Sequence, residues 1–316
     1  MENHNDLLVH ISQLYYQQNL SQNEIAKIIG ISRPTVSRLL DEARQTGVVE
    51  IIVHDPIRKN PDLSIEVRKK FDLREAVIIS GNFKHDIAME RCAQVAAQFL
   101  SGILENNMSI GFSWGRAITA VCNAIKPKEY YNVTVAQMAG CLATGNPHLD
   151  GMELAMDVAR KFNGTYTNVV SPVFVDHLLV QNALLSTPQI KKALDIASNL
   201  DIALTGVGTF NDKNSTLLLS DCSTEEERAE AIQNGAVGHI LARFIDKDGK
   251  EVFFPNHYPI TVPLDALKVP KWSIGIVVTS QKAEATLAAI RGGYINSLIA
   301  DEPLALELLK LAETLE

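Results

Sequence analysis

The sequence is poor in cysteine and contains no long hydrophobic run. Four cysteines lie far apart, with no Cys-x-x-Cys pair and no histidine at zinc-ligand spacing: Cys92, Cys122, Cys141 and Cys222. We therefore expect reduced, mostly buried thiols rather than a disulfide framework or a zinc site. No apolar stretch approaches the roughly 18 residues that a membrane span needs, and no secretory signal is visible at the first residues. These absences predict a cytoplasmic protein with no membrane partner.

An excess of positive charge is absent as well. The 316 residues carry 29 Lys and Arg against 37 Asp and Glu, a net charge of −8, which at first argues against nucleic acid as a partner. Hydrophobic residues make up 46% of the chain and charged residues 21%, so wholesale disorder is excluded. The length exceeds one average domain and suits two.

Catalytic motifs are also missing. The sequence has no Ser/His/Asp order with local support, no His-Glu-x-x-His, no Walker A run and no Gly-x-Gly-x-x-Gly. An enzyme would have to draw its acid and base from scattered side chains. We therefore expect a protein that binds rather than catalyses, without a metal or cofactor.

Two regions are expected. Residues 1–54 are rich in short helical signals, and two prolines with mixed charge mark 55–62 as a linker. In residues 63–316, apolar runs alternate with helical stretches, which favours a parallel sheet covered on both faces. The expected strands are 76–79, 108–112, 133–135, 201–204, 274–278 and 295–299, and the expected helices are 88–101, 116–125, 151–162, 189–199, 281–291 and 302–313.

The first region carries paired helix signals. Ser21 and Glu24 form a capping box, Gly30 suits a helix end that needs a positive φ, and Ser32 caps a second helix with Pro34 in its first turn. Apolar side chains follow at one-face spacing: Leu7, Leu8, Ile11, Leu14, Tyr15, Ile25, Ile28, Ile29, Val36, Leu39, Leu40 and Ala43. Beyond Gly47, residues 48–53 are expected to form a strand, such as a small wing.

An ordinary αα-hairpin would share some of these signals. The joint pattern, with small Ala26 where the helices cross, is typical of a helix-turn-helix. In that motif the start of the second helix meets base edges and phosphates in the major groove of double-stranded DNA. The candidate DNA contacts are Ser32, Arg33, Pro34, Thr35, Ser37 and Arg38. Each has the alternative of being a solvated surface residue.

The second region carries glycine turns after its expected strands. Ile110–Arg116 is a strand, a Gly/Ser turn and a helix start, where backbone N–H groups and the helix dipole favour an anion. A tight turn that uses glycine for geometry alone is the alternative. Residues 137–141 and 204–209 are similar turns, and in an open parallel sheet several such turns can converge on one crevice.

Three further features of this region are ambiguous by themselves. Ser280 is an expected helix N-cap, and Lys282 in the first turn is either solvated or binds an anion. His239 lies in an apolar run, which is more typical of a core histidine than of a ligand contact. Asp246 and Asp248 predict a hairpin turn.

Taken together, the chain resembles the SorC/DeoR-type sugar-binding transcriptional regulators, with some features closest to the sorbose-operon branch. The resemblance runs nearly end to end and rests on residues 14–16, 21–26, 31–40, 110–116, 236–238, 244–249, 273–276 and 292–296. It implies an α/β fold class: an all-α helix-turn-helix head, then a Rossmann-like parallel domain similar to sugar-phosphate isomerases. It also implies a homotetrameric regulator of a carbohydrate-catabolism operon, whose affinity for operator DNA changes when a phosphorylated sugar binds.

The resemblance also implies an effector site. The loop Ser113–Arg116 would take the phosphate. The site residues would be Gly111, Ser113, Trp114, Gly115, Arg116, Gly140, Gly208, His239 and Lys282. Many relatives have an acidic residue in place of His239, and many have Ala-Gly-Gly where residues 278–280 stand. Ala139 replaces a lysine of some relatives and argues against a Schiff-base effector. The alternative function is a sugar-phosphate isomerase or hydrolase with a DNA-binding head.

Overall fold

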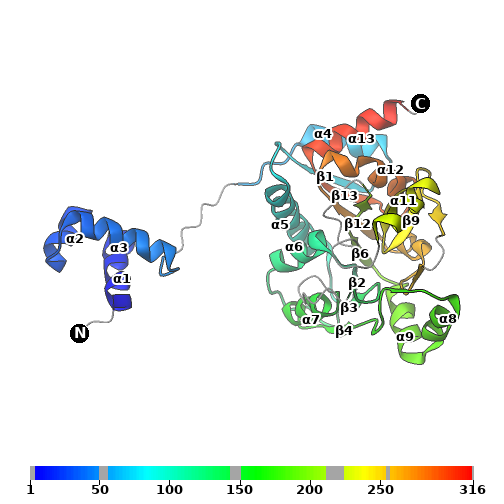
Figure 1. The fold of residues 1–316 in the computed structure, drawn as a ribbon, viewed down its shortest axis with the longest axis horizontal. Coiled ribbons are helices and arrows are strands. Elements are labelled where there is room, and N and C mark those ends of the chain that lie inside the picture. The colour runs from blue at the N-terminus through cyan, green and yellow to red at the C-terminus, as the bar shows by residue number, and fades with distance from the viewer. Residues whose placement is uncertain (1–3, 50–55, 143–150, 211–223, 254–256, 315–316) are drawn as a thin grey trace. The chain divides into compact units, whose positions relative to one another are not determined.

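The computed structural model describes residues 4–49, 56–142, 151–210, 224–253 and 257–314. The chain divides into two compact units, Met1–Pro56 and Ile57–Glu316. Figure 1 shows a helical first unit and a second unit built on a sheet.

The first unit contains three helices around one small core. They are α1 (His4–Ser12), continued by the π-helical turn η1 (Gln13–Gln17), α2 (Gln22–Ile29) and α3 (Arg33–Gln45). Leu8, Ile11, Ile25, Val36 and Leu39 are buried together in that core. The apolar spacing of the sequence therefore predicted the faces on which these helices pack.

The capping signals of the first unit are confirmed. The Glu24 backbone N–H donates to the Ser21 hydroxyl, and the Glu24 carboxylate accepts from the Ser21 N–H, as a capping box requires. Gly30 ends α2 with a φ of 78°, a conformation that costs glycine little. The Ser32 hydroxyl accepts from the Thr35 N–H and starts α3.

Two details of the first unit differ from expectation. Ile28 is 58% exposed, whereas Ile25 of the same helix is buried in the core and Ile29 packs against it. Val48 and Val49 lie in a bend rather than in a strand, and the Val49 N–H donates to the Ala43 carbonyl at the end of α3. Of the expected wing strand, residues 50–53 lie outside the described residues.

The second unit is built on a seven-stranded sheet in the order β1-β13-β12-β6-β2-β3-β4, with every pairing parallel. The strands are β1 (Glu75–Ile79), β2 (Ser109–Phe112), β3 (Thr134–Gln137), β4 (Thr165–Thr167), β6 (Ile202–Thr205), β12 (Trp272–Val277) and β13 (Ser297–Asp301). The six expected strands fall on members of this sheet. The short strand β4 was not anticipated.

Helices pack against this sheet through two large apolar clusters. One cluster includes residues of α4 (Pro61–Lys70), α9 (Pro188–Ala197), α12 (Ala283–Arg291) and α13 (Glu302–Thr314). The other includes residues of α5 (His85–Ile103), α6 (Arg116–Ala124) and α7 (Gly151–Phe162). Strands buried between two such layers need the continuous apolar runs seen in the sequence.

A smaller antiparallel sheet and several short elements complete the second unit. The sheet has the order β10-β9-β8-β7. Its strands are β7 (Gly208–Thr209), β8 (Ala236–Ile240), β9 (Arg243–Asp246) and β10 (Glu251–Val252), and the other elements are β5 (Phe174–Val175) paired with β11 (Tyr258–Pro259), α8 (Leu178–Ser186), α11 (Glu225–Gln233), η2 (Leu264–Lys268) and η3 (Ser280–Lys282). The predicted hairpin turn at Asp246 and Asp248 is confirmed, since it joins β9 to β10.

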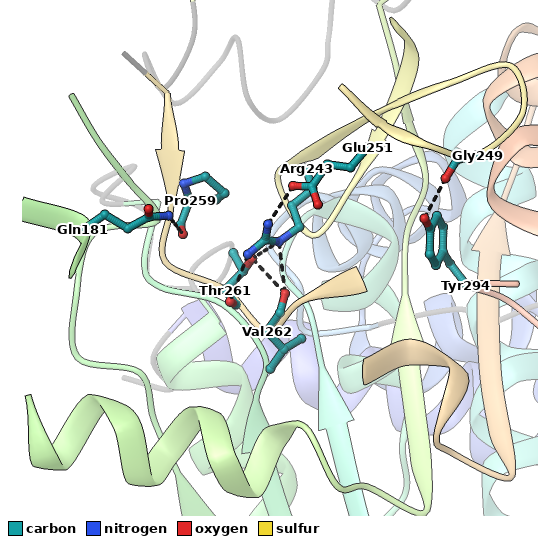
Figure 2. Close-up of polar contacts among 8 residues, drawn as sticks. All are labelled: Gln181, Arg243, Gly249, Glu251, Pro259, Thr261, Val262 and Tyr294. Carbon is teal, nitrogen blue, oxygen red and sulfur yellow. Dashed lines mark hydrogen bonds and ion pairs between the residues drawn. The ribbon is translucent and has the colours of Figure 1, made fainter. Parts of the chain in front are cut away.

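The turn between β8 and β9 has unusual backbone conformations. Leu241 and Ala242 have φ values of 50° and 61°, as in the two-residue turns that usually take asparagine and glycine. Arg243 holds the next strand in place: its guanidinium donates to the Glu251 carboxylate at 2.6 Å and to Thr261 Oγ1 at 2.9 Å (Figure 2). The surrounding contacts therefore impose a turn that Leu and Ala do not favour.

The expected linker 55–62 differs from the structure over most of its length. The Ser80 N–H donates to the Arg58 carbonyl, and the Asn60 N–H donates to the Ile78 carbonyl. Asn60 also caps α4, which begins at Pro61. Pro61 begins a helix instead of preventing one, because the first helical position needs no N–H donor. Residues 57–62 thus belong to the second unit.

Candidate functional site

The exposed residues at the start of α3 form the candidate DNA-contacting surface. Ser32, Arg33, Pro34 and Arg38 are exposed, while Thr35 and Ser37 are half-buried. The buried stripe of α3 faces the core of the first unit, so these residues project away from it. The Thr35 hydroxyl lies 2.8 Å from that of Ser32, which engages it in the cap.

A second candidate site is a cavity at the carboxyl ends of the central strands of the large sheet. Its lining comes from the segments that follow β2, β6 and β12, from the β8 hairpin and from α5. From β2 the chain continues outward through β3 and β4, whereas β6 lies on the other side of β2 and leads to β12 and β13. The cavity therefore lies at the point where the strand order reverses, where open α/β sheets bind ligands.

One wall of the cavity suits an anion. Helix α6 begins at Arg116, and its N-cap Gly115 has a φ of 102° and provides no side-chain cap. The N–H groups of a first helical turn have no partner within the helix, and the helix dipole adds positive potential there. The side chains of Arg116 and Lys282 also line the cavity. A phosphate or carboxylate is the chemistry that such a wall accommodates.

His239 lies on the cavity wall as a neutral ring. It is 7% exposed, and its Nε2 atom is buried without a hydrogen-bond partner among the described residues. Burial, together with the smaller effects of the nearby Lys282 and His257, lowers the pKa of His239 to about 3. A Cβ placed on Gly208 would lie 1.9 Å from His239 Nε2. Glycine at 208 is therefore what allows the imidazole to occupy this position.

Trp114 lines the same cavity and is also 7% exposed. Its indole Nε1 is buried, again without a hydrogen-bond partner among the described residues. An indole N–H can only donate, and buried polar groups in native proteins usually have a partner. Two residues that line the cavity thus each carry a buried nitrogen without a hydrogen-bond partner among the described residues.

The loop that carries Lys282 is held by a buried carboxylate. Thr279 has a φ of 79°, which is rare for a β-branched residue, and its N–H donates to both carboxylate oxygens of Asp301 at 3.0 and 3.1 Å. Asp301 is 2% exposed, and burial raises its pKa. Ser280 is not the helix cap expected from the sequence, because η3 begins at Ser280 with Thr279 as its N-cap.

Seven of the nine expected effector contacts line the cavity: Ser113, Trp114, Gly115, Arg116, Gly208, His239 and Lys282. Gly111 and Gly140 do not. A Cβ on Gly111 would lie 2.2 Å from the Leu200 side chain, and one on Gly140 would lie 2.5 Å from the Pro172 carbonyl oxygen. These two glycines allow close packing between chain segments, which the sequence pattern does not distinguish from a ligand turn.

Other residues that line the cavity were not predicted. They are Met89, Ala117, Gly206, Val207, Thr209, Leu241, Ile276 and Val278. The expected glycine turn at 204–209 gave a signal for three of them. Met89 and Leu241 come from a helix and from a hairpin turn that apolar periodicity alone assigns to the core.

Two classes of site are absent from the described ranges. Those residues contain no group of three or more His, Cys, Asp or Glu placed to hold a metal ion. None of the helices in them is both long enough and apolar enough to cross a bilayer. Cys92 and Cys122 are buried thiols, and Cys141 is a half-buried thiol whose Sγ accepts from the Gln137 side-chain amide. Cys222 lies outside the described residues.

The two units define a class of protein: a helix-turn-helix head joined to an α/β unit with a cavity for a small ligand. Residues 55–310 match the family described as "Putative sugar-binding domain", and residues 7–58 match the Crp-like helix-turn-helix domain. The chain belongs to this sugar-binding-domain family of transcriptional regulators, which confirms the resemblance to SorC and DeoR-type proteins.

Individual relatives match over nearly their whole length. The transcriptional regulator YjhU of Escherichia coli K12 is 30% identical over 304 residues, covering 94% of this chain and 92% of its own. The sorbitol operon regulator of Klebsiella pneumoniae is 28% identical, covering 98% and 100%. The crystal structure of that full-length regulator, SorC, aligns with a TM-score of 0.72 at 27% identity and covers 98% of both chains. The relatives are named transcriptional regulators, so this protein is a regulator and not an enzyme.

Proposed function

We propose that the protein regulates a carbohydrate-catabolism operon and that a phosphorylated sugar in the cavity controls its affinity for the operator. The names of two relatives, a sorbitol operon regulator and a deoxyribonucleoside regulator of Bacillus subtilis, support the carbohydrate class. The observation that supports a phosphorylated effector is the start of α6, which has no side-chain cap and lines the cavity together with Arg116 and Lys282.

In this proposal the start of α3 reads the operator. Arg33 and Arg38 reach guanine edges or phosphates, and Ser37 binds a base or phosphate. Ser32 and Thr35 place the helix start, since their hydroxyls form the cap. Pro34 is exposed in the first turn and packs against the sugar-phosphate backbone.

We also propose that several heads act together, as in a homotetramer. Residues 21–47 carry four cations and three carboxylates, a net charge of only +1. Because DNA affinity depends on neutralising phosphates, one such head binds weakly, and linked heads add avidity. Helix α8 supports self-association: its Leu178, Leu179 and Val180 are exposed, and it carries no charged residue in a chain of net charge −8. Sedimentation of wild type and Leu179→Glu tests this, and an unchanged oligomer in the variant would exclude α8 as the contact.

The effector proposal is tested with operator DNA and a panel of sugars and their phosphates. We expect phosphorylated members to change operator affinity about 5–150-fold, the range of ordinary allosteric coupling, and unphosphorylated members to have no effect. Arg116→Ala and Lys282→Ala should abolish the response while leaving operator binding without effector intact. Exposed Lys271→Ala, away from the cavity, is the control. If both cavity variants respond like wild type, the phosphate binds elsewhere.

A further inference from the structure

We propose that Trp114 and His239 recognise oxygen atoms of the effector's non-phosphate end, and that they select a neutral, hydroxyl-bearing sugar over deoxy or ammonium-bearing analogues. This inference rests on the proposed function and concerns the same cavity. It starts from two buried nitrogen atoms, Trp114 Nε1 and His239 Nε2, which both lack a hydrogen-bond partner among the described residues. The proposed phosphate site at the start of α6 does not account for them.

Both nitrogens belong to side chains of residues that line this cavity. Each side chain is 7% exposed and lines the cavity. Trp114 packs in an apolar cluster with Phe210 and Phe244, and the His239 ring lies 6.3 Å from the Phe210 ring, centroid to centroid. Apolar neighbours offer no hydrogen bond in exchange, so a ligand oxygen is the natural partner for each nitrogen.

The donor chemistry decides which ligand group fits. The indole N–H only donates, so the ligand atom beside it must accept a hydrogen bond. An ammonium group cannot accept, and Arg116 and Lys282 in the same cavity repel it. The neutral imidazole of His239 has one donating and one accepting nitrogen, which suits a hydroxyl, since a hydroxyl both donates and accepts.

Selectivity against deoxy sugars follows from the same geometry. A site built around buried polar groups rejects an analogue that lacks the matching hydroxyl, because the buried groups then stay unpaired. A histidine at 239 differs here from a carboxylate, which would accept hydrogen bonds only and would attract an amine. The fixed position of the ring, with Gly208 directly beside Nε2, makes the distance to the ligand oxygen specific.

The test uses isothermal titration with named probes: inorganic phosphate, glucose 6-phosphate, sorbitol 6-phosphate, ribose 5-phosphate, and their deoxy and amino analogues. We expect wild type to bind at least one hydroxylated monophosphate about tenfold more tightly than inorganic phosphate, and to bind its amino and some deoxy analogues about tenfold more weakly. Trp114→Phe, which removes the N–H but keeps an aromatic ring, should lose that preference.

Matched variants at 239 separate recognition from packing. His239→Gln keeps a polar group near the position of Nε2 and should retain most of the preference, whereas His239→Leu should lose it. Affinity for inorganic phosphate is measured in the same three variants, so that a lost preference for hydroxyl groups is distinguished from weaker phosphate binding.

A spectroscopic measurement on the wild-type protein tests the same inference and does not require any variant to fold. The chain has two tryptophans, and Trp272 contacts Phe99 and Arg74 instead of the cavity. The indole N–H resonance of Trp114 should shift when the tightest probe binds, while that of Trp272 should not.

Two results would overturn the inference. One is that no hydroxylated monophosphate binds more tightly than inorganic phosphate. The other is that Trp114→Phe and His239→Leu keep the wild-type preference for hydroxylated over deoxy probes. If the phosphorylated sugars still change operator affinity in that second case, the proposed function stands and only this assignment fails.

Discussion

Two helices of this protein begin in contrasting ways. Ser32 is the N-cap of helix α3, and its hydroxyl accepts from the Thr35 N–H, so a side chain of the protein caps this helix. Gly115 is the N-cap of helix α6 and has no side chain to cap it. The comparison shows that the residue before a helix decides whether its first N–H groups receive a side-chain cap, as in α3, or none, as in α6 at the cavity.

The largest effect is expected from a substitution that disrupts the cavity of the second unit and does not alter the first unit. Gly208→Ala places a methyl group where His239 Nε2 now lies. Overpacking of this kind costs about 1–3 kcal/mol, and the displaced ring should also abolish effector-induced stabilisation. Thermal unfolding with and without a phosphorylated sugar measures both effects.

Gly206→Ala is the matched control, because a Cβ there meets nothing within 4 Å. It should unfold like wild type. Equal loss of stability in the two variants would show that the contact between Gly208 and His239 is not responsible.

The second expected effect concerns the side chains presented by α3. Arg33→Ala and Arg38→Ala should each cost about 1–3 kcal/mol of specific operator binding if the arginine contacts a base. Fluorescence anisotropy with operator and random DNA measures the affinity and its specificity.

Arg44→Ala removes the same charge from the far end of α3, where Arg44 pairs with Asp41. It should weaken binding to operator and random DNA by the same small factor. An equal loss of specificity in Arg44→Ala would move the recognition surface away from the start of α3.

The third effect depends on pH. Burial lowers the pKa of His239 to about 3, against 6.5 for the unperturbed side chain, so between these values the unfolded chain binds a proton that the folded chain does not. Stability is therefore full above about pH 6.5 and falls on acidification, by up to about 1.4 kcal/mol per pH unit from this group. Urea unfolding between pH 4.5 and 7.5 measures the slope.

His257 contributes in the same direction, because burial lowers its pKa as well. His239→Gln should make the slope shallower and should leave the contribution of His257 in place. An unchanged slope would show that His239 is not a buried neutral ring.

The smallest effect returns to the cap of α3. Ser32→Ala should destabilise the first unit by about 1 kcal/mol, while Ser32→Asp should preserve the cap and weaken DNA binding, since it adds a negative charge where phosphate is expected. Circular dichroism of thermal unfolding and DNA titration separate the two effects. If Ser32→Ala is as stable as wild type, the cap of α3 contributes little.

The sequence predicted the fold well where local chemistry decides it. The capping box at Ser21, the positive φ of Gly30 and the six main strands follow from side-chain type and periodicity. Prediction of the site succeeded where a strand, a glycine turn and a helix start coincide, as in the loop from Ser113 to Arg116.

The remainder depends on contacts between distant segments. Gly111 and Gly140 resemble ligand turns in sequence, yet they face Leu200 and Pro172. Leu241 lines the cavity from the turn before Arg243, whose side chain contacts Glu251 and Thr261 (Figure 2). No local pattern contains that information, since both partners of each contact must already be in place.

The position of the cavity at the reversal of strand order has a consequence for the lifetime of the protein. Its walls come from segments between residues 89 and 282, so they come together only when most of the second unit is folded. A ligand bound there stabilises the entire unit by mass action, about 2.7 kcal/mol at a hundredfold excess over its dissociation constant. A bound effector would therefore slow proteolysis of the regulator. The protein would last longer in cells that contain the effector than in cells that lack it.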